Sequence, residues 1–203
     1  MQLPEKTIER LLLYKVLLLE LKNLDRTNIH SHELAEIANN NSAQVRRDIM
    51  ATGFTGIPAK GYQINDLINK IKETLNLNSK INMCLVGIGN LGSAIIHFFG
   101  EHNTRFELKA AFDTNPQKVN NTIAGCKTYK MDDLSSIIKQ EKITLGIIAT
   151  PASNAQQVAN SLVENGIKGI FNFTSHPLQV PKTVKLNRLD ITLQLEKLAF
   201  FSH

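Results

Sequence analysis

Gly87, Gly89 and Gly92 form the spacing G-x-G-x-x-G between an apolar run and a segment of helical periodicity. At such a junction the first glycine permits a tight turn, the second lets the backbone approach a pyrophosphate, and the third lets the helix pack closely on the strand. The free N–H groups at the helix start favour a bound phosphate. The segment 87–92 therefore predicts a dinucleotide site. The same loop also contributes Ile88, Asn90 and Leu91.

A carboxylate, Asp113, follows the apolar run 106–112, about 20 residues after the last of these glycines. A carboxylate there accepts a hydrogen bond from the ribose 2′-hydroxyl and repels a 2′-phosphate. Neither Thr114 nor Asn115 supplies the positive charge that a 2′-phosphate needs. The sequence thus predicts NAD(H) in preference to NADP(H). The alternative is an unrelated βα unit in which the strand-end Asp caps a loop.

Two further apolar runs, 143–149 and 169–173, predict strands of the same parallel sheet. Because ligands bind at the carboxyl ends of such strands, the residues that end them are expected to border the nicotinamide side of the site. Asn172 is equally suited to satisfy a backbone group at the strand end. These strand ends, with the loop after the acidic residue, assign to the cofactor site Ala149, Thr150, Pro151, Asn172, Phe173, Thr114 and Lys118.

The first 78 residues show helical periodicity instead. A long amphipathic helix opens after Pro4, a second begins at Ser31, and a third follows Ser42 as its N-cap. The asparagine run 39–41 allows a tight turn between the last two helices. The glycine-punctuated stretch 53–64 predicts a small hairpin wing, so this unit is expected to be a winged helix-turn-helix.

The third helix of this unit is the candidate DNA-reading helix. Gln44, Arg46 and Arg47 are expected on its exposed side, and these residue types suit bidentate contacts to adenine and guanine. Ser42 at the helix start can contact a phosphate, and Lys60 is the cation of the wing. An arginine pair can also merely solvate a surface helix, but its position on the second helix of a helix-turn-helix favours DNA binding.

The chain has 203 residues, which suits one large domain or two modest ones. Its formal net charge of +5 nominates no nucleic-acid partner by itself. Two cysteines provide neither a disulfide framework nor a cysteine-rich zinc site, and we expect no metal site. The most apolar early stretch, 11–21, contains Lys15 and Glu20, so neither a signal peptide nor a membrane span is expected. These features favour a cytoplasmic protein.

A small NAD-dependent oxidoreductase is the main alternative, because the same glycine motif serves many enzymes. Such an enzyme needs a substrate region and a proton donor or acceptor, yet only 174–203 remain after the last predicted strand. His176 is the one catalytic candidate, and a solvated loop histidine is the plainer interpretation. We therefore expect no catalytic residues. A third hypothesis is a DNA-binding protein whose Rossmann domain serves only dimerisation, which the intact glycines and Asp113 disfavour.

A winged helix followed by a Rossmann unit resembles the bacterial Rex family of redox-sensing transcriptional repressors, and the similarity extends over nearly the whole chain. Five segments carry it: 44–49, 87–94, 111–116, 166–170 and 172–173. The resemblance implies an α/β fold with a winged helix-turn-helix DNA-binding domain (1–78), a Rossmann-like NAD(H)-binding domain with a parallel sheet (79–186) and a C-terminal dimerisation helix (187–203). It further implies a homodimer that binds a palindromic operator, loses operator affinity when NADH binds, and exchanges its final helix between subunits.

The apolar residues of 189–201 independently suggest that a partner subunit covers the last helix, with packing on its own sheet as the alternative. Two departures from the family pattern concern signalling. Phe98, which we place beside the nicotinamide, stands where many members carry a tyrosine, and Val16 where many carry an arginine, while Asp190 keeps its carboxylate. Because neither residue can join a polar relay, we hypothesise that NAD(H) binds but that NADH-dependent release from DNA is weakened or altered.

Overall fold

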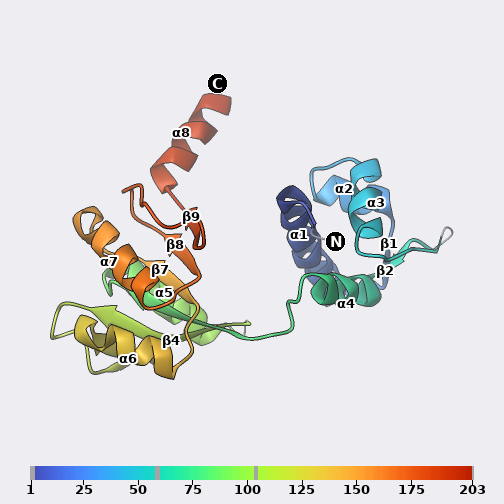
Figure 1. Cartoon of the computed structure of the whole chain (residues 1–203). Coiled ribbons are helices and arrows are strands. Elements are labelled where there is room, and N and C mark those ends of the chain that lie inside the picture. Colours follow the sequence, from blue (N-terminus) through green and yellow to red (C-terminus); the bar gives the residue numbers. More distant parts are fainter. Residues whose placement is uncertain (1–2, 58–59, 103–104, 203) are drawn as a thin grey trace. The chain divides into compact units, whose positions relative to one another are not determined.

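The computed structural model describes residues 3–57, 60–102 and 105–202, and the chain divides into two compact units, Met1–Ser79 and Lys80–His203 (Figure 1). The first unit is mainly helical and the second is an α/β sheet unit. Within the described residues, every helix is too short or too polar to span a membrane. Each unit has hydrophobic clusters of its own.

The first unit buries one face of each of its helices. On α1, Leu11, Tyr14 and Leu18 follow a three- and four-residue spacing and are fully buried, as amphipathic helices require. Val45 and Ile49 are also fully buried, as their spacing on the third helix predicts. The elements of this unit are α1 (Glu5–Asn23), β1 (Asn28–Ile29), α2 (Ser31–Ile37), α3 (Ser42–Met50), β2 (Tyr62–Gln63) and α4 (Ile64–Thr74).

Helices α2 and α3 form the predicted helix-turn-helix, and α2 begins at Ser31 as predicted, but the N-cap of α3 differs from the prediction. Asn41, rather than Ser42, caps α3, and its side-chain oxygen accepts a hydrogen bond of 2.8 Å from the Gln44 N–H. Asparagine is as good an N-cap as serine, and here the chain has already reversed at Asn39, whose φ is 51°. At α2, His30 is the cap residue, and the Glu33 carboxylate accepts from its backbone N–H at 2.7 Å.

The segment predicted as a hairpin wing makes two kinds of antiparallel pairing among the described residues. Ile57 and Gly61 form an isolated antiparallel bridge, but strand β2 pairs with β1, with Ile29 opposite Tyr62. This pairing buries Ile29 and Tyr62 in the core of the unit, which the predicted local hairpin would not do. Gly61 permits the close approach, since its φ is 73° and an added Cβ would lie 2.5 Å from the Ile29 carbonyl oxygen.

The second unit contains a sheet of seven strands within the described residues, in the order β5-β6-β4-β3-β7-β8-β9. All neighbouring strands are parallel except β5, which runs antiparallel to β6. The chain thus starts at the centre of the sheet and moves outward on each side in turn, as in dinucleotide-binding folds. The strands are β3 (Ile81–Val86), β4 (Phe106–Asp113), β5 (Thr122–Ile123), β6 (Cys126–Lys130), β7 (Leu145–Ile148), β8 (Gly169–Asn172) and β9 (Lys185–Arg188).

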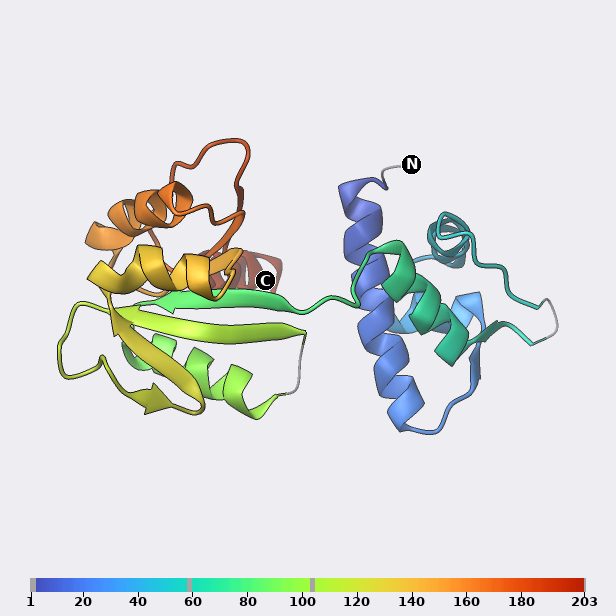
Figure 2. The same cartoon turned by 60° about the horizontal axis from the view of Figure 1, so that its bottom comes forward.

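Helices cover both faces of this sheet (Figure 2). Helices α6 (Leu134–Gln140) and α7 (Ala152–Glu164) lie on one face, where their buried residues pack with Phe112 and Ile148. Helix α5 (Asn90–Glu101) lies on the other, where Ile96 packs with Leu85. Both faces of the central strands are therefore buried, which explains their continuous apolar sequences.

The last helix, α8 (Ile191–Phe201), is left uncovered by the other described residues of its own unit. Its apolar side chains keep much of their surface in solvent, from 59% for Ile191 to 77% for Phe200. Asp190 caps it by accepting from the Leu193 N–H at 3.1 Å. The helix therefore forms through its own backbone and cap, without burying its apolar side chains on its own sheet.

Candidate functional site

The three glycines of the fingerprint lie at the junction of β3 and α5, and each has a different environment. Gly87 has a φ of 101°, and an added Cβ would lie 2.6 Å from the Ala149 carbonyl oxygen. At Gly92 an added Cβ would lie 1.9 Å from the Gly87 carbonyl oxygen. At Gly89, the N-cap of α5, it would meet no heavy atom of the described residues within 4 Å, apart from the two adjoining residues. Gly87 and Gly92 therefore hold the turn together, whereas Gly89 leaves open space above the helix N-terminus, where a pyrophosphate fits.

Asp113 ends β4 beside this turn. One carboxylate oxygen, Oδ2, accepts a hydrogen bond of 2.7 Å from the Ile88 N–H, and Oδ1 accepts one of 2.8 Å from the Asn115 N–H. The carboxylate therefore fixes the glycine turn and the loop after β4 relative to each other. Each carboxylate oxygen has a second lone pair, so Asp113 can still accept bonds from ribose hydroxyls.

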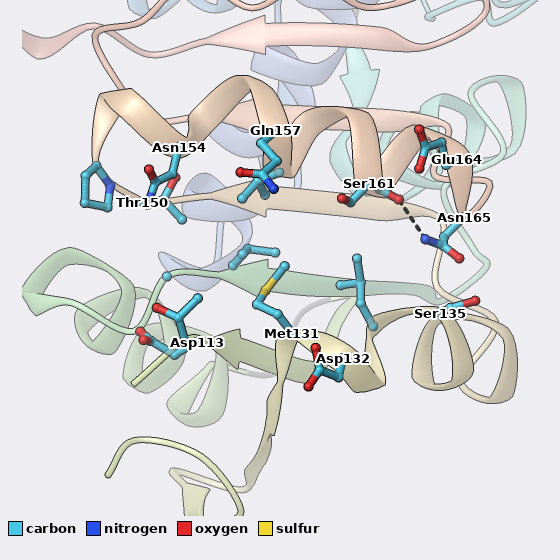
Figure 3. Close-up of a pocket in the computed structure, with 16 residues that line it drawn as sticks. Asp113, Met131, Asp132, Ser135, Thr150, Asn154, Gln157, Ser161, Glu164 and Asn165 are labelled. Carbon is cyan, nitrogen blue, oxygen red and sulfur yellow. Dashed lines mark hydrogen bonds between the residues drawn. The ribbon is translucent and has the colours of Figure 1, made fainter. Parts of the chain in front are cut away.

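A cavity of about 430 Å³ opens over the carboxyl ends of β3, β4 and β7 and continues between α6 and α7 (Figure 3). Its volume suits a sizeable ligand. The Thr150 hydroxyl is buried there and has no hydrogen-bond partner among the described residues, so it remains available to a bound group. Five of the predicted cofactor residues line the cavity: Gly87, Asp113, Thr114, Thr150 and Pro151.

Further residues of the cavity, most of them polar, were missed from the sequence. Asn154 and Gln157 of α7 project into it from one side, and Met131 and Asp132 from the connection between β6 and α6 (Figure 3). Exposed polar residues on a helix resemble any solvated surface in the sequence, so no signal distinguishes them. The following also line the cavity: Ser135, Ser161, Glu164 and Asn165.

The remaining predicted cofactor residues do not line this cavity. Asn172 is fully buried, and its carboxamide donates to the His176 carbonyl at 2.9 Å and accepts from the Thr174 N–H at 2.9 Å. Its amide therefore shapes the loop after β8, which is the structural alternative stated above. Phe98 is 51% exposed on α5 and stacks on His102 with ring centroids 4.4 Å apart. The others lie in the glycine loop, in the loop after β4, or at the ends of β7 and β8: Ile88, Gly89, Asn90, Leu91, Gly92, Lys118, Ala149 and Phe173.

The candidate catalytic histidine and both cysteines lie outside the lining of this cavity. His176 is exposed in the loop after β8. Cys84 and Cys126 are buried, and burial raises the pKa of the Cys84 thiol to about 12 and that of Cys126 to about 11. Since the thiolate is the reactive form, both thiols are inert at neutral pH.

The predicted DNA-binding residues lie along α3 and at the turn that precedes β2. Arg46, Arg47 and Lys60 are exposed, and Ser42 is half-buried in the first turn of α3. Arg46 donates to the Ser31 hydroxyl at 3.1 Å. Gln44 is half-buried, and both ends of its carboxamide are hydrogen-bonded within the unit. The two arginines therefore form the exposed cationic part of α3.

A buried carboxylate anchors α3 to α1. Asp48 is 2% exposed, and the Arg10 guanidinium donates to both of its oxygens, at 2.6 and 2.7 Å. The Tyr14 hydroxyl donates at 3.0 Å and the Gln44 amide at 2.9 Å. Burial acts to raise the pKa of Asp48, but the hydrogen bonds from Arg10, Gln44 and Tyr14 outweigh it and hold that pKa below the ordinary 3.8. Burial and the bond to Asp48 raise the pKa of Tyr14 to about 12.

Fold and site together define a helix-turn-helix unit joined to a Rossmann-type nucleotide-binding unit. The profile described as "CoA binding domain" matches residues 78–176, and that described as "Putative DNA-binding protein N-terminus" matches residues 2–49. The redox-sensing transcriptional repressor Rex of Syntrophobacter fumaroxidans is 42% identical over 98% of this chain and 95% of its own. The protein of that name from Limosilactobacillus reuteri is 36% identical over 98% of this chain and 94% of its own.

Solved structures of a Rex-family repressor named RSP are similar to this chain over nearly its full length. Its complex with β-NAD⁺ and operator DNA matches with a TM-score of 0.90 and 32% identity, over 99% of this chain and 93% of that one. Its complex with β-NADH matches with a TM-score of 0.87 and 32% identity, over 99% and 94%. The chain therefore belongs to the Rex family of redox-sensing transcriptional repressors.

Proposed function

We propose that this protein is a transcriptional repressor that binds operator DNA through α3 and senses the NADH/NAD⁺ ratio through its Rossmann unit. One observation carries the proposal: the same chain contains a helix-turn-helix and a nucleotide-type glycine turn. At that turn the N-terminus of α5 is open and the carboxylate of Asp113 lies at the end of β4. The solved relative bound to β-NAD⁺ and operator DNA, and its β-NADH complex, support both halves.

The residues at the crevice fit NAD(H). The α5 N-terminus beneath Gly89 would hold the pyrophosphate, Asp113 the ribose, and Thr150 a polar group of the nicotinamide half. The nicotinamide supplies the redox signal, since its oxidised and reduced forms differ by a hydride and a positive charge. The negative charge of Asp113 disfavours a 2′-phosphate, so we propose NAD(H) rather than NADP(H) as the ligand.

A homodimer on a palindromic operator is part of the proposal. The uncovered apolar face of α8 supports a second copy of the chain as the group that covers it, because exposed patches of this kind mark interfaces. Two copies present two α3 helices, and two-fold related reading helices require a palindromic site. Cytoplasmic location follows from this role in transcription.

We further propose that the chain is not an oxidoreductase. The relatives are named as repressors, and the candidate proton donor, His176, lies in an exposed loop outside the cavity lining. NADH absorbance should stay constant when the protein is incubated with a panel of 2-oxo acids and aldehydes. Turnover of any of them would favour the enzyme alternative.

Thermal unfolding of the full chain with NADH, NAD⁺ or NADPH tests the cofactor. A ligand at a hundredfold excess over its Kd stabilises by about 2.7 kcal/mol. For a chain of this size that corresponds to a Tm increase of about 5–10 °C. We expect this shift with NADH, a smaller one with NADPH, and loss of the difference in Asp113→Asn. The absence of any shift would favour the Rossmann unit serving only dimerisation.

A further inference from the structure

Gln44, which the sequence nominates to read an adenine, lies between two charged groups of opposite sign. Its amide nitrogen donates to Asp48 at 2.9 Å, and its amide oxygen accepts from the Arg47 guanidinium at 2.8 Å. A carboxylate only accepts hydrogen bonds and a guanidinium only donates them. The orientation of the Gln44 carboxamide is therefore set by its neighbours, and its two reading groups are both engaged inside the protein.

Asp48 cannot move to release it. The carboxylate is 2% exposed and takes two hydrogen bonds from Arg10 and one from Tyr14, both on α1. Tyr14 is fully buried and accepts in turn from Asn40 in the turn before α3, at 2.9 Å. A hydrogen-bond network thus runs from α1 through Asp48 to Gln44, and charge-assisted contacts in the packed interior hold it at Asp48.

The hydrogen-bond network ends at the surface with Arg47, which is exposed on α3. An unrestrained arginine loses rotamer freedom when it contacts a base, and a fixed acceptor removes part of that cost beforehand. The neighbouring Arg46 is tied to a different group, the Ser31 hydroxyl of α2. The two arginines therefore have separate supports.

We infer that Gln44 is a positioning residue that orients Arg47 for guanine readout and does not itself read a base. The inference rests on the proposed operator-binding function. Arg47 is then the specificity-determining side chain of this part of α3, and Asp48, Arg10 and Tyr14 transmit the position of α1 to it. Loss of Gln44 should alter recognition at the base pair that Arg47 contacts.

The test uses the full chain and a palindromic duplex that the wild-type protein selects from a randomised library. A series of variant duplexes is then made, in each of which one base pair is changed symmetrically in both half-sites. We expect Gln44→Met and Gln44→Ala to weaken binding to the selected duplex about tenfold and to lose preference at the same guanine as Arg47→Gln. In the Arg47→Gln background, Gln44→Met should change affinity less than about twofold, because coupled residues are non-additive.

The matched control is Arg46→Gln, in which Gln44→Met should keep its full effect because Arg46 is tied to Ser31. Binding to a scrambled duplex should be equal in the wild type and both Gln44 variants, which separates positioning from loss of folding. The inference is overturned if Gln44 variants lose preference at an adenine for which Arg47→Gln keeps its preference. It is also overturned if the fold-losses in affinity of the Gln44 and Arg47 variants multiply in the double variant. Failure of the wild-type protein to select any duplex would instead refute operator binding.

Discussion

Two alanine substitutions in the glycine turn should separate its structural role from its binding role. Gly89 has φ −81° and ψ −165°, which any residue adopts, and an added Cβ would meet no heavy atom within 4 Å. Gly92 offers no such room, since an added Cβ would lie 1.9 Å from the Gly87 carbonyl oxygen. The same methyl group therefore enters empty space at one position and backbone at the other.

The expected magnitudes follow from these contacts. In Gly89→Ala, the reduced entropy of the unfolded chain stabilises by about 0.4–1 kcal/mol, and the poorer N-cap costs about 0.5–1 kcal/mol. The two effects nearly cancel, so Tm should stay within about 2 °C of the wild type. Gly92→Ala must displace backbone, which costs about 1–3 kcal/mol or more and lowers Tm by about 2–12 °C or more. Yet Gly89→Ala should bind NADH about tenfold more weakly, because the methyl group occupies the place of the pyrophosphate.

Calorimetric titration with NADH and thermal unfolding of the ligand-free protein measure the two effects separately. Gly100→Ala is the matched control, because its Cβ would lie 2.4 Å from the Ala124 carbonyl oxygen, away from the proposed site. This variant should lower Tm and, while folded, keep wild-type NADH affinity. Unchanged NADH affinity in Gly89→Ala, together with unchanged Tm, would refute the placement of the pyrophosphate over the α5 N-terminus.

Three further predictions concern signalling, acid stability and thiol chemistry. At matched NADH saturation, the double variant Phe98→Tyr, Val16→Arg should lose more operator affinity than the wild type in fluorescence anisotropy; equal losses would contradict an altered relay. The pKa of Asp48 lies below its ordinary value of 3.8, so the carboxylate stabilises the native state above that pH, and this contribution disappears as the pH falls through the lowered pKa. Urea unfolding followed by circular dichroism should therefore show a smaller loss of stability on acidification in Asp48→Asn than in the wild type, and parallel losses would argue against the buried network. Cys84 and Cys126 should react slowly with a disulfide reagent at neutral pH until the protein unfolds, because burial raises both thiol pKa values; rapid labelling of either thiol in the native state would contradict their packing.

The central strands and the glycine turn could be predicted because their signals are local. The segment 81–92 combines an apolar strand, three spaced glycines and a helix start, and each feature has a separate physical cause. The fold class followed from the alternation of such units. Strands β5, β6 and β9 were not predicted. Strand β5 has only two residues, Cys126–Lys130 is a mostly polar sequence, and Lys185–Arg188 is an exposed edge strand with charged ends.

The rest depends on tertiary contacts that the sequence does not reveal. Asp48, in the middle of a charged helix, reads as a solvated residue until Arg10, 38 positions earlier, is placed against it. Its burial then determines the orientation of Gln44, which helical periodicity alone assigned to DNA. The hairpin wing was predicted from glycines close in sequence, whereas burying Tyr62 required the more distant partner strand at Ile29.

The most direct test of redox-sensing repression is operator binding by the full chain as the NADH/NAD⁺ ratio is varied at constant total nucleotide. The probe is a palindromic duplex selected from a randomised library, read by fluorescence anisotropy, with NADPH as the control nucleotide. We predict tight dimeric binding whose affinity falls as the NADH fraction rises and does not respond to NADPH at equal concentration. Binding that is the same at every NADH/NAD⁺ ratio would leave a DNA-binding protein but contradict redox sensing.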